Sequence, residues 1–284
     1  MDPKSKKVLL LGIGETGLNV VRIIAENEVK GIATFGIKNE SELEMLTGEI
    51  TEEVELVLLV ADLGNNKENS LALKAAASTK RSGRALAAIL TTPRLFEGEK
   101  AVIRALEVAR EINDEADSSL IINKETFNRP TEKGCTFVEL INSLVSVEET
   151  IAEGIQDIIS LISEKGTIKI DVEDLGIALS KSGTFTIGSG IGAGENRVGL
   201  AIEQALSSPL MKKCDISTAR RVLIKVFVPK NSPLMMNEMK AITAFIETLP
   251  SYADVKWGVG ESDDDDILSV IFLASGFDVK LPEE

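Results

Sequence analysis

A glycine-rich segment near the start of the chain has the spacing of a phosphate-binding loop. Gly12, Gly14 and Gly17 follow a short apolar run and precede Asn19, which gives the pattern GxGxxG between an expected strand and an expected helix. Such glycines allow a tight turn and a close approach of the backbone, and a helix N-terminus favours the negative charge of a phosphate. A strand-to-helix turn also uses glycine without any ligand, so this motif leaves both a phosphate site and a structural turn open.

The same motif begins nicotinamide dinucleotide sites, which need an acidic residue at the end of the second strand. Lys38 stands nearest to that position here, and Glu40 follows slightly late. The NAD fingerprint is therefore incomplete, while an NADP site stays open. An NAD(P)-binding Rossmann enzyme is one alternative, although no later segment supports hydride chemistry.

The composition limits the chemistry that these segments can do. The chain has 284 residues, no histidine, two cysteines (Cys135 and Cys214) and a formal net charge of -14. Imidazole-based triads and most zinc sites are therefore excluded, and an acidic surface argues against a nucleic-acid partner. The apolar run Val8 to Leu11 is too short for a signal core or a membrane span. We expect a cytoplasmic protein with no bound metal of its own and no direct membrane binding.

Short apolar runs alternate with helical patterns in the first part of the chain. The predicted strands are Val8 to Leu11, Ile32 to Ile37, Val54 to Ala61, Ala85 to Thr91 and Leu120 to Asn123. The predicted helices are Leu18 to Glu26, Ser70 to Arg81 and Lys100 to Asn113. This alternation predicts a Rossmann-like parallel sheet with helices on both faces, and ligands of such sheets lie at the carboxyl ends of the strands.

The later part of the chain predicts a long central helix followed by a smaller α+β domain. Isoleucines at helical spacing indicate one helix over Val147 to Lys165. The predicted strands are Arg221 to Pro229, Val255 to Val259 and Leu268 to Ala274, and the predicted helices are Asn196 to Leu206 and Pro233 to Leu249. We therefore expect a nucleotide-binding-type domain over 1–146, a core helix over 147–166 and a carboxyl-terminal domain over 167–284.

Several segments together resemble the cell-division GTPase family FtsZ of the tubulin superfamily. Four matches follow in order in the second half: Ile187 to Arg197 (IGSGIGAGENR), Ala201 to Leu210, Ala219 to Leu223 and Ala274 to Phe277. Further matches are Gly12 to Val21, Thr91 to Gly98 (TTPRLFEG) and the helix that contains Gln156. The resemblance covers nearly the whole chain and implies the tubulin/FtsZ fold.

The resemblance implies head-to-tail polymerisation with GTP and its magnesium ion held between two subunits. An acidic loop of one subunit, with the pattern Asn-x-Asp-x-x-Asp, completes the site of the next. Lys169 stands here in place of the asparagine, whereas Asp171 and Asp174 match. The family scheme makes these two aspartates the catalytic pair, because carboxylates orient a water and bind hard cations. Capping of the following helix by the same two side chains is the alternative.

The resemblance carries over eight nucleotide-binding positions, one of them changed in type. They are Gly12, Gly14, Gly17, Asn19, Gly64, Glu97, Asn123 and Glu149, the last at the place of the guanine-reading aspartate. The phosphate loop departs most, because the family has GGGTGTG where residues 64–70 read GNNKENS. Each non-glycine residue in left-handed geometry costs about 1–2 kcal/mol. A carboxylate at Glu68 about 4 Å from a phosphate would add about 4 kcal/mol of repulsion at an effective dielectric constant of 20.

Two further departures weaken the expected pocket. Ala101 replaces a basic residue, and the loop before Val54 is shorter than in the family. We therefore expect a divergent FtsZ-like protein with weak or absent GTP binding, which assembles with itself or with a genuine FtsZ subunit and modulates filaments. The alternatives are an active GTPase whose first glycine loop alone holds the phosphates and a nucleotide-free homo-oligomer.

Overall fold

The computed structural model describes residues 7–124, 146–162, 166–211, 214–262, 264 and 266–277. The chain forms two compact units, Met1–Glu153 and Gly154–Glu284, so the helix α6 (Val147–Leu161) contributes residues to both. Each unit has its own buried apolar cluster. The proposed functional division at residues 147 and 167 stays a prediction.

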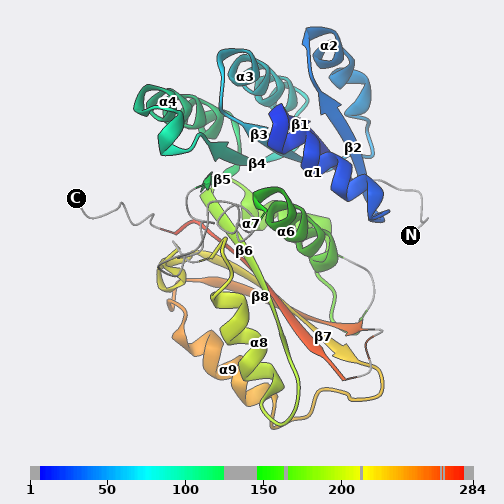
Figure 1. Ribbon diagram of the computed structural model, residues 1–284. Helices are drawn as coiled ribbons and strands as arrows, with labels where there is room; N and C mark the ends of the chain where they lie inside the picture. Colours follow the sequence, from blue (N-terminus) through cyan, green and yellow to red (C-terminus); the bar gives the residue numbers. More distant parts are fainter. Residues whose placement is uncertain are drawn as a thin grey trace, which may run out of the picture. The chain divides into compact units, whose positions relative to one another are not determined.

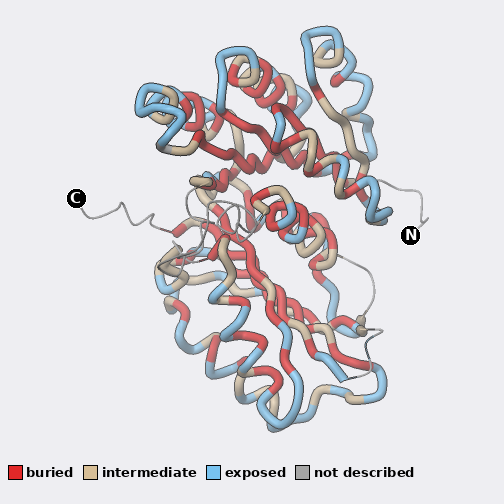
Figure 2. The backbone as a smooth tube through the Cα atoms, in the orientation of Figure 1, coloured by how far each residue is buried: buried red, intermediate tan, exposed pale blue. Residues whose placement is uncertain are grey.

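The first unit contains the parallel sheet that the sequence predicts. Its strands are β1 (Val8–Ile13), β2 (Ile32–Ile37), β3 (Leu56–Asp62), β4 (Ala85–Thr92) and β5 (Ser118–Asn123), in the order β2-β1-β3-β4-β5. All neighbouring pairs run parallel. Every residue of β1 and β3 is buried, as Figure 2 shows in red. Continuous apolar runs of this kind belong to strands that are covered on both faces.

Helices cover both faces of this sheet (Figure 1). They are α1 (Gly14–Glu26), α2 (Glu40–Glu49), α3 (Asn66–Arg81) and α4 (Glu99–Glu115), with a short 3-10 turn η1 (Leu95–Glu97) before α4. Leu9, Leu11 and Ile13 of β1 share a buried cluster with residues of α2, α3 and α4. The small residues Ala75 and Ala109 let the helices approach the sheet closely. The predicted fold class is confirmed.

Three predictions for this unit need correction, since helix α3 also begins early, at Asn66 and not at Ser70. Helix α1 begins at Gly14 and not at Leu18, so its first turn lies inside the glycine motif. Helix α2 was not expected, because its sequence has little apolar periodicity and only Leu46 is buried. Asn39 nevertheless caps it, with its side chain accepting the N–H of Glu42 at 3.1 Å.

The second unit has a four-stranded mixed sheet. Its strands are β6 (Gly183–Gly192), β7 (Arg221–Pro229), β8 (Asp254–Ser262) and β9 (Leu268–Ser275), in the order β6-β9-β7-β8. Strands β7 and β8 run parallel, and β9 is antiparallel to both β6 and β7. The helices are α7 (Val172–Leu179), α8 (Arg197–Leu206) and α9 (Met239–Thr248), with a 3-10 turn η3 (Ile216–Thr218).

Strand β6 was missed because it is rich in glycine, which normally weakens a strand. A side chain at Gly188 would lie 2.6 Å from Met211 Cγ, and one at Gly190 would lie 2.5 Å from the backbone nitrogen of Ala205. The glycines therefore form the face on which α8 packs closely. The predicted helix from Pro233 is also wrong in its start, since α9 begins at Met239.

A buried lysine closes the end of α6 within the second unit. Lys225 of β7 has no exposed surface, and its Nζ donates to the carbonyl oxygens of Ser160 at 3.1 Å and Leu161 at 2.8 Å. Cations favour the carboxyl end of a helix. Burial lowers the pKa of Lys225 to about 8. The predicted helix Val147 to Lys165 thus ends earlier, at Leu161, and residues 163–165 lie outside the described residues.

Candidate functional site

The glycines of the first motif are all explained by packing at the carboxyl edge of the first unit's sheet. A side chain at Gly12 would lie 2.7 Å from Val21 Cγ2, and one at Gly17 would collide with the carbonyl oxygen of Val60. Gly14 has a φ of +74° and its absent side chain would lie 2.8 Å from Asp62 Cβ. The turn from β1 into α1 therefore requires these glycines whether or not a phosphate is bound.

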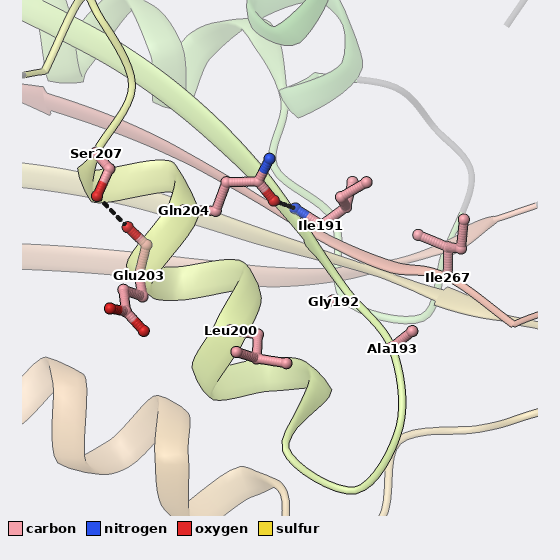
Figure 3. Close-up of a pocket in the computed structure, with 8 residues that line it drawn as sticks. All are labelled: Ile191, Gly192, Ala193, Leu200, Glu203, Gln204, Ser207 and Ile267. Atoms are coloured by element: carbon pink, nitrogen blue, oxygen red, sulfur yellow. Dashed lines mark hydrogen bonds between the residues drawn. The ribbon is translucent and has the colours of Figure 1, made fainter.

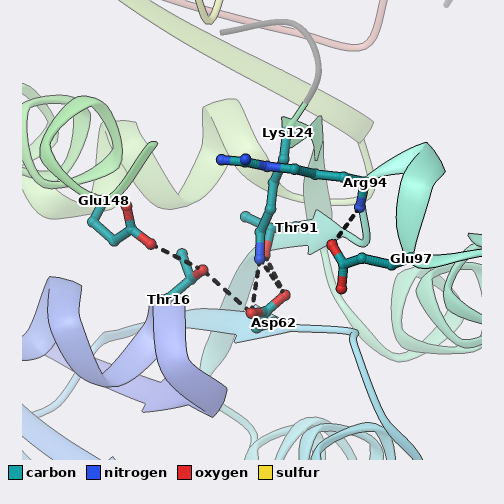
Figure 4. A network of polar contacts seen from close by, with 7 residues as sticks. All are labelled: Thr16, Asp62, Thr91, Arg94, Glu97, Lys124 and Glu148. Carbon is teal, nitrogen blue, oxygen red and sulfur yellow. Dashed lines mark hydrogen bonds and ion pairs between the residues drawn. The ribbon is translucent and has the colours of Figure 1, made fainter. Parts of the chain in front are cut away.

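A buried carboxylate, Asp62, stands at this edge and was not singled out by the sequence motifs. It ends β3 and is 7% exposed. Lys124 Nζ lies 2.9 and 2.8 Å from its two carboxylate oxygens, and Thr91 donates to it at 3.0 Å. Thr16 of α1 donates at 3.3 Å (Figure 4). We call Thr16, Asp62, Thr91 and Lys124 the Asp62 cluster.

The Asp62 cluster is satisfied by its own members. A buried carboxylate is stable when a cation and hydrogen-bond donors surround it, and Asp62 has both. Lys124 lies where a cation could otherwise meet a phosphate, but its ammonium group is already paired with both oxygens of Asp62. The cluster therefore offers no uncommitted positive charge to an anion.

Glu68 of α3 adds a second carboxylate next to the first glycine motif. Its Cδ lies 3.2 Å from the position that a Cβ of Gly14 would occupy. Burial raises the pKa of Glu68, and the neighbouring charges of Asp62 and Glu15 act in the same direction, against Asn65 and Lys124. A phosphate that approached Gly14 would thus meet the carboxylates of Glu68 and Asp62.

The start of α3 has its amide groups occupied by its own cap. The side chain of Asn65 accepts the N–H groups of Lys67 at 3.1 Å and Glu68 at 3.0 Å. Free amides at a helix N-terminus are the groups that usually bind a phosphate. Gly64, the matched glycine of the phosphate loop, is exposed one residue before this cap. The segment has become an ordinary capped helix start.

The remaining predicted nucleotide positions lie in the first unit without converging on one hydrogen-bonded group. Asn19 accepts from Arg22 at 3.5 Å on α1, and Glu97 accepts the backbone N–H of Arg94 at 2.7 Å in η1 (Figure 4). Asn123 is the last residue of β5 and is half-buried. Asn19 and Glu97 are thus positioned by local contacts.

At the start of α6, Glu148 contacts the first glycine motif in place of the predicted residue Glu149. Glu149 is exposed, and its backbone N–H is bound to Ser146 Oγ at 3.1 Å. Glu148 instead accepts from Thr16 at 3.3 Å and from Ser146 at 3.2 Å. The carboxylate that reaches the first glycine motif is therefore Glu148, because its position on the helix faces α1.

The two aspartates of the acidic loop cap α7. Asp171 Oδ1 accepts the N–H of Asp174 at 2.9 Å, and Asp174 Oδ2 accepts the N–H of Asp171 at 2.9 Å, a reciprocal capping box. The capping alternative is thus confirmed. Asp174 also pairs with Lys256 of β8. Burial alone would raise the pKa of Asp174, but the hydrogen bonds with Lys256 and Asp171 outweigh it and the pKa is lowered.

The acidic loop keeps part of its charge at the surface. Asp171 and Glu173 are exposed, and so is Lys169, which stands before them. Lys256 is a partner that the sequence did not indicate, because it lies on a strand 82 positions away from Asp174. The catalytic role of the two aspartates stays a prediction.

The described residues give little support for a metal site, a reactive thiol or a membrane span. No group of three or more His, Cys, Asp or Glu residues in the described ranges is arranged to hold a metal ion. Burial raises the pKa of the free thiol of Cys214, which disfavours the reactive thiolate. Cys135 lies outside the described residues. Over the same described ranges, no helix combines the length and the apolar character that crossing a bilayer requires.

A pocket lies in the second unit, between β6 and α8 (Figure 3). Its volume is about 520 Å³, and Ile191, Leu200 and Ile267 give it an apolar lining. Gln204 accepts the N–H of Ile191 at 2.9 Å, and Ser207 donates to the carbonyl oxygen of Glu203 at 2.9 Å. The Gln204 oxygen and the Ser207 hydroxyl are thus used in internal hydrogen bonds.

Comparison with known proteins places the chain among relatives of FtsZ. Residues 183–278 match the model of the FtsZ family, C-terminal domain. The chain is 29% identical to cell division protein FtsZ of Porphyromonas gingivalis over 68% of this chain and 41% of that protein. It is 27% identical to cell division protein FtsZ of Buchnera aphidicola over 65% of this chain and 47% of that protein.

This chain is similar in sequence to FtsZ, with a family-model match over residues 183–278, and it has the tubulin/FtsZ fold. Its fold is that of the M. jannaschii FtsZ dimer structure, described as empty, with a TM-score of 0.79 at 20% identity over 97% of this chain and 89% of that one. The GDP-bound CetZ1 monomer of Haloferax volcanii has a TM-score of 0.75 at 16% identity over 96% and 94% of the two chains. The FtsZ resemblance drawn from the motifs is confirmed. The matched region spans less than half of the two curated FtsZ relatives.

Proposed function

We propose that this FtsZ-like protein acts in a cell-division or cytoskeletal assembly as a subunit that does not hold GTP. One observation carries the proposal. The place where a nucleotide phosphate would meet the first glycine motif is lined by Glu68 and Asp62, and the ammonium of Lys124 is paired with Asp62. A carboxylate within a few ångströms of a phosphate repels it strongly.

The backbone supports the same proposal. An FtsZ-type phosphate loop needs free amides and glycines, whereas α3 starts with an Asn65 cap that uses the amides of Lys67 and Glu68. A GTP phosphate would therefore have to displace a side-chain cap as well as overcome the carboxylate of Glu68, while Lys124 is already paired with Asp62. Replacing a cap costs about 1 kcal/mol, and each unfavourable charge adds to that.

The acidic loop supports an assembly role for the second unit. Asp171 and Glu173 remain exposed at the start of α7, on a helix end that the capping box holds rigid. A subunit that keeps the two aspartates of the acidic loop but cannot hold GTP at its first glycine motif would bind the nucleotide face of a genuine FtsZ subunit without offering such a face itself. It would thereby limit or modulate a filament. Self-association through the same loop is the related possibility, since solved relatives include an FtsZ dimer.

Nucleotide content tests the first part of the proposal. Protein purified without added nucleotide is extracted and examined for guanine nucleotide, and calorimetry follows the addition of GTP with magnesium. We expect no bound nucleotide and no binding in the micromolar range. Micromolar affinity would show instead an active pocket rebuilt around the first glycine loop. A parallel titration with NADPH, followed by fluorescence, tests the nicotinamide alternative.

A mixing experiment tests the second part. The protein is added below equal amounts to a polymerising FtsZ, and GTP turnover and filament length are measured. We expect shorter filaments, with the effect weakened by Glu173→Arg, which reverses an exposed charge of the acidic loop without removing a cap. Glu203→Arg, a charge reversal on the exposed side of α8, is the matched control. Unchanged filaments with the unaltered protein would contradict the modulating role.

A further inference from the structure

We propose that the second unit contains a phosphate-binding pocket, formed by Lys181, Arg220 and Arg221. It is separate from the first glycine motif, which lies in the first unit. The pocket has a volume of about 290 Å³ and is also lined by Ser182, Ser275, Gly276 and Phe277. Three cations converge on it in a chain whose net charge is -14. The ligand class is a phosphate monoester, either free or on a lipid headgroup.

The three cations lack the partners that other cations of this chain have. Ion pairs join, for example, Lys124 to Asp62, Arg197 to Glu238 and Lys256 to Asp174. No ion pair among the described residues includes any of the three pocket cations. Even Asp254, the register neighbour of Arg221 on β8, makes none with it. Within the described ranges, their positive charges are therefore not neutralised by a carboxylate.

The backbone holds two arginines rigidly at the edge of the pocket. The backbone N–H of Arg220 donates to Ser275 at 3.0 Å, and its carbonyl oxygen accepts from Asp254 at 2.8 Å. The side-chain stem of Arg220 lies on Gly276, where an added Cβ would be 3.1 Å from Arg220 Cβ. One nitrogen of Arg221 donates to the carbonyl oxygen of Ser180 at 2.7 Å, and the rest of its donors remain. Paired guanidinium groups suit the oxygens of a phosphate.

Lys181 lies at a strained position of the backbone and lines the pocket. It has a φ of 48°, in the left-handed region, at the turn that follows α7. Glycine is the favoured residue at such a position after a helix, and a lysine there is strained. Glu28 has the same backbone state after α1, so the strain alone does not assign a role to the Lys181 side chain. Here the side chain adds the third charge to the pocket.

The size and lining of the pocket favour a small anion over a peptide. A volume of about 290 Å³ is at the lower end of the range for ligand sites. Peptide docking depends on apolar anchors, and the one aromatic residue of the lining, Phe277, is only 7% exposed. A phosphate group with its few oxygens matches the three cations.

Calorimetry of the full chain with inorganic phosphate at low salt tests the proposal. We expect a dissociation constant in the millimolar range or below that rises with added sodium chloride. Arg220→Gln, which keeps most of the stem on Gly276, should weaken binding about tenfold, the effect of losing a charge-assisted contact. Lys181→Gly should weaken it about threefold while leaving the fold at least as stable, because glycine relieves the backbone strain.

Matched controls separate charge from backbone effects. Glu28 is the other described non-glycine residue with a positive φ, 49°, so Glu28→Gly gives the same backbone relief without changing the pocket. Lys240→Gln removes an exposed cation of α9 outside the pocket. Both variants should bind phosphate as the unaltered protein does. Unchanged affinity in the combined Arg220→Gln and Lys181→Gly variant would overturn the proposal.

A vesicle sedimentation experiment distinguishes a lipid headgroup from a free phosphate compound. Vesicles of phosphatidylcholine with and without phosphatidic acid are sedimented with the protein. Binding to phosphatidic acid that the combined variant loses identifies a lipid headgroup, and binding of inorganic phosphate alone identifies a free phosphate compound. Binding in neither arm overturns the proposal. That outcome would not bear on the proposal that the first glycine motif holds no GTP, because this motif lies in the other unit and is tested separately with GTP.

Discussion

The two acidic regions of this chain use carboxylates in opposite ways. At the first unit's sheet edge, Asp62 is buried and closed on itself by Lys124, Thr91 and Thr16. At the start of α7, Asp171 caps the helix and stays exposed. The first region is saturated by its own contacts, whereas the second keeps charge for a partner. The comparison teaches that the same residue type can be closed to ligands in one part of the fold and remain accessible in another.

Breaking the Asp62 ion pair should have the largest effect. Lys124→Met leaves a buried carboxylate without its cation, so we expect a loss of about 3 kcal/mol in the free energy of unfolding. Denaturant unfolding at neutral pH measures it. The double variant with Asp62→Asn should recover most of the loss. A loss below about 1 kcal/mol for Lys124→Met would show that Asp62 is not closed by this pair.

Removing the cap of α7 should have a smaller effect. Asp171→Ala deletes the acceptor of the Asp174 N–H and should cost about 1 kcal/mol of unfolding free energy. Glu173→Ala, in the same exposed turn but outside the capping box, is the control and should change little. Equal losses in the two variants would argue that the capping box contributes no specific stability.

The Asp174 contacts predict a pH dependence. The pKa of Asp174 lies below its ordinary value of 3.8, so its stabilisation is fully present above that value and is lost as the pH falls through the lower folded pKa. Lys256→Met should therefore cost about 0.5 kcal/mol at neutral pH, since Lys256 is partly exposed. The difference from the unaltered protein should vanish in strong acid. A difference independent of pH would place the effect in packing.

Glu68 should give the smallest effect, with the opposite sign. Its pKa is raised, so the ionised carboxylate is disfavoured in the fold and stability falls as the pH rises through the folded pKa. Glu68→Gln should gain a few tenths of a kcal/mol at neutral pH, reduced by solvent screening. Thermal unfolding at pH 7 and at acidic pH measures this gain, which should disappear in acid. A loss of stability would mean that the Glu68 charge is favourable where it lies.

The predicted elements of the first unit followed from the sequence because its strands are continuous apolar runs. Helix α2 was not predicted because only Leu46 of its residues is buried. Strand β6 was not predicted because its glycines, which allow α8 to pack closely, have a low strand propensity. Among site residues, Glu148 and Lys256 could not be found from spacing, since their partners lie on distant segments. Asp62 did leave a signal, as the only charged residue of an otherwise apolar strand.

The sequence by itself determined the family resemblance, the α/β alternation and the loss of glycines at residues 64–70, because these depend on residue type and order. Only the tertiary structure decided that Asp62 and Lys124 neutralise each other and that Glu68 stands beside Gly14. Only the fold brings Lys181 to Arg220 and Arg221. Charges separated along the chain interact only where the fold brings them within a few ångströms, and at that distance they decide whether a site stays open to an anion.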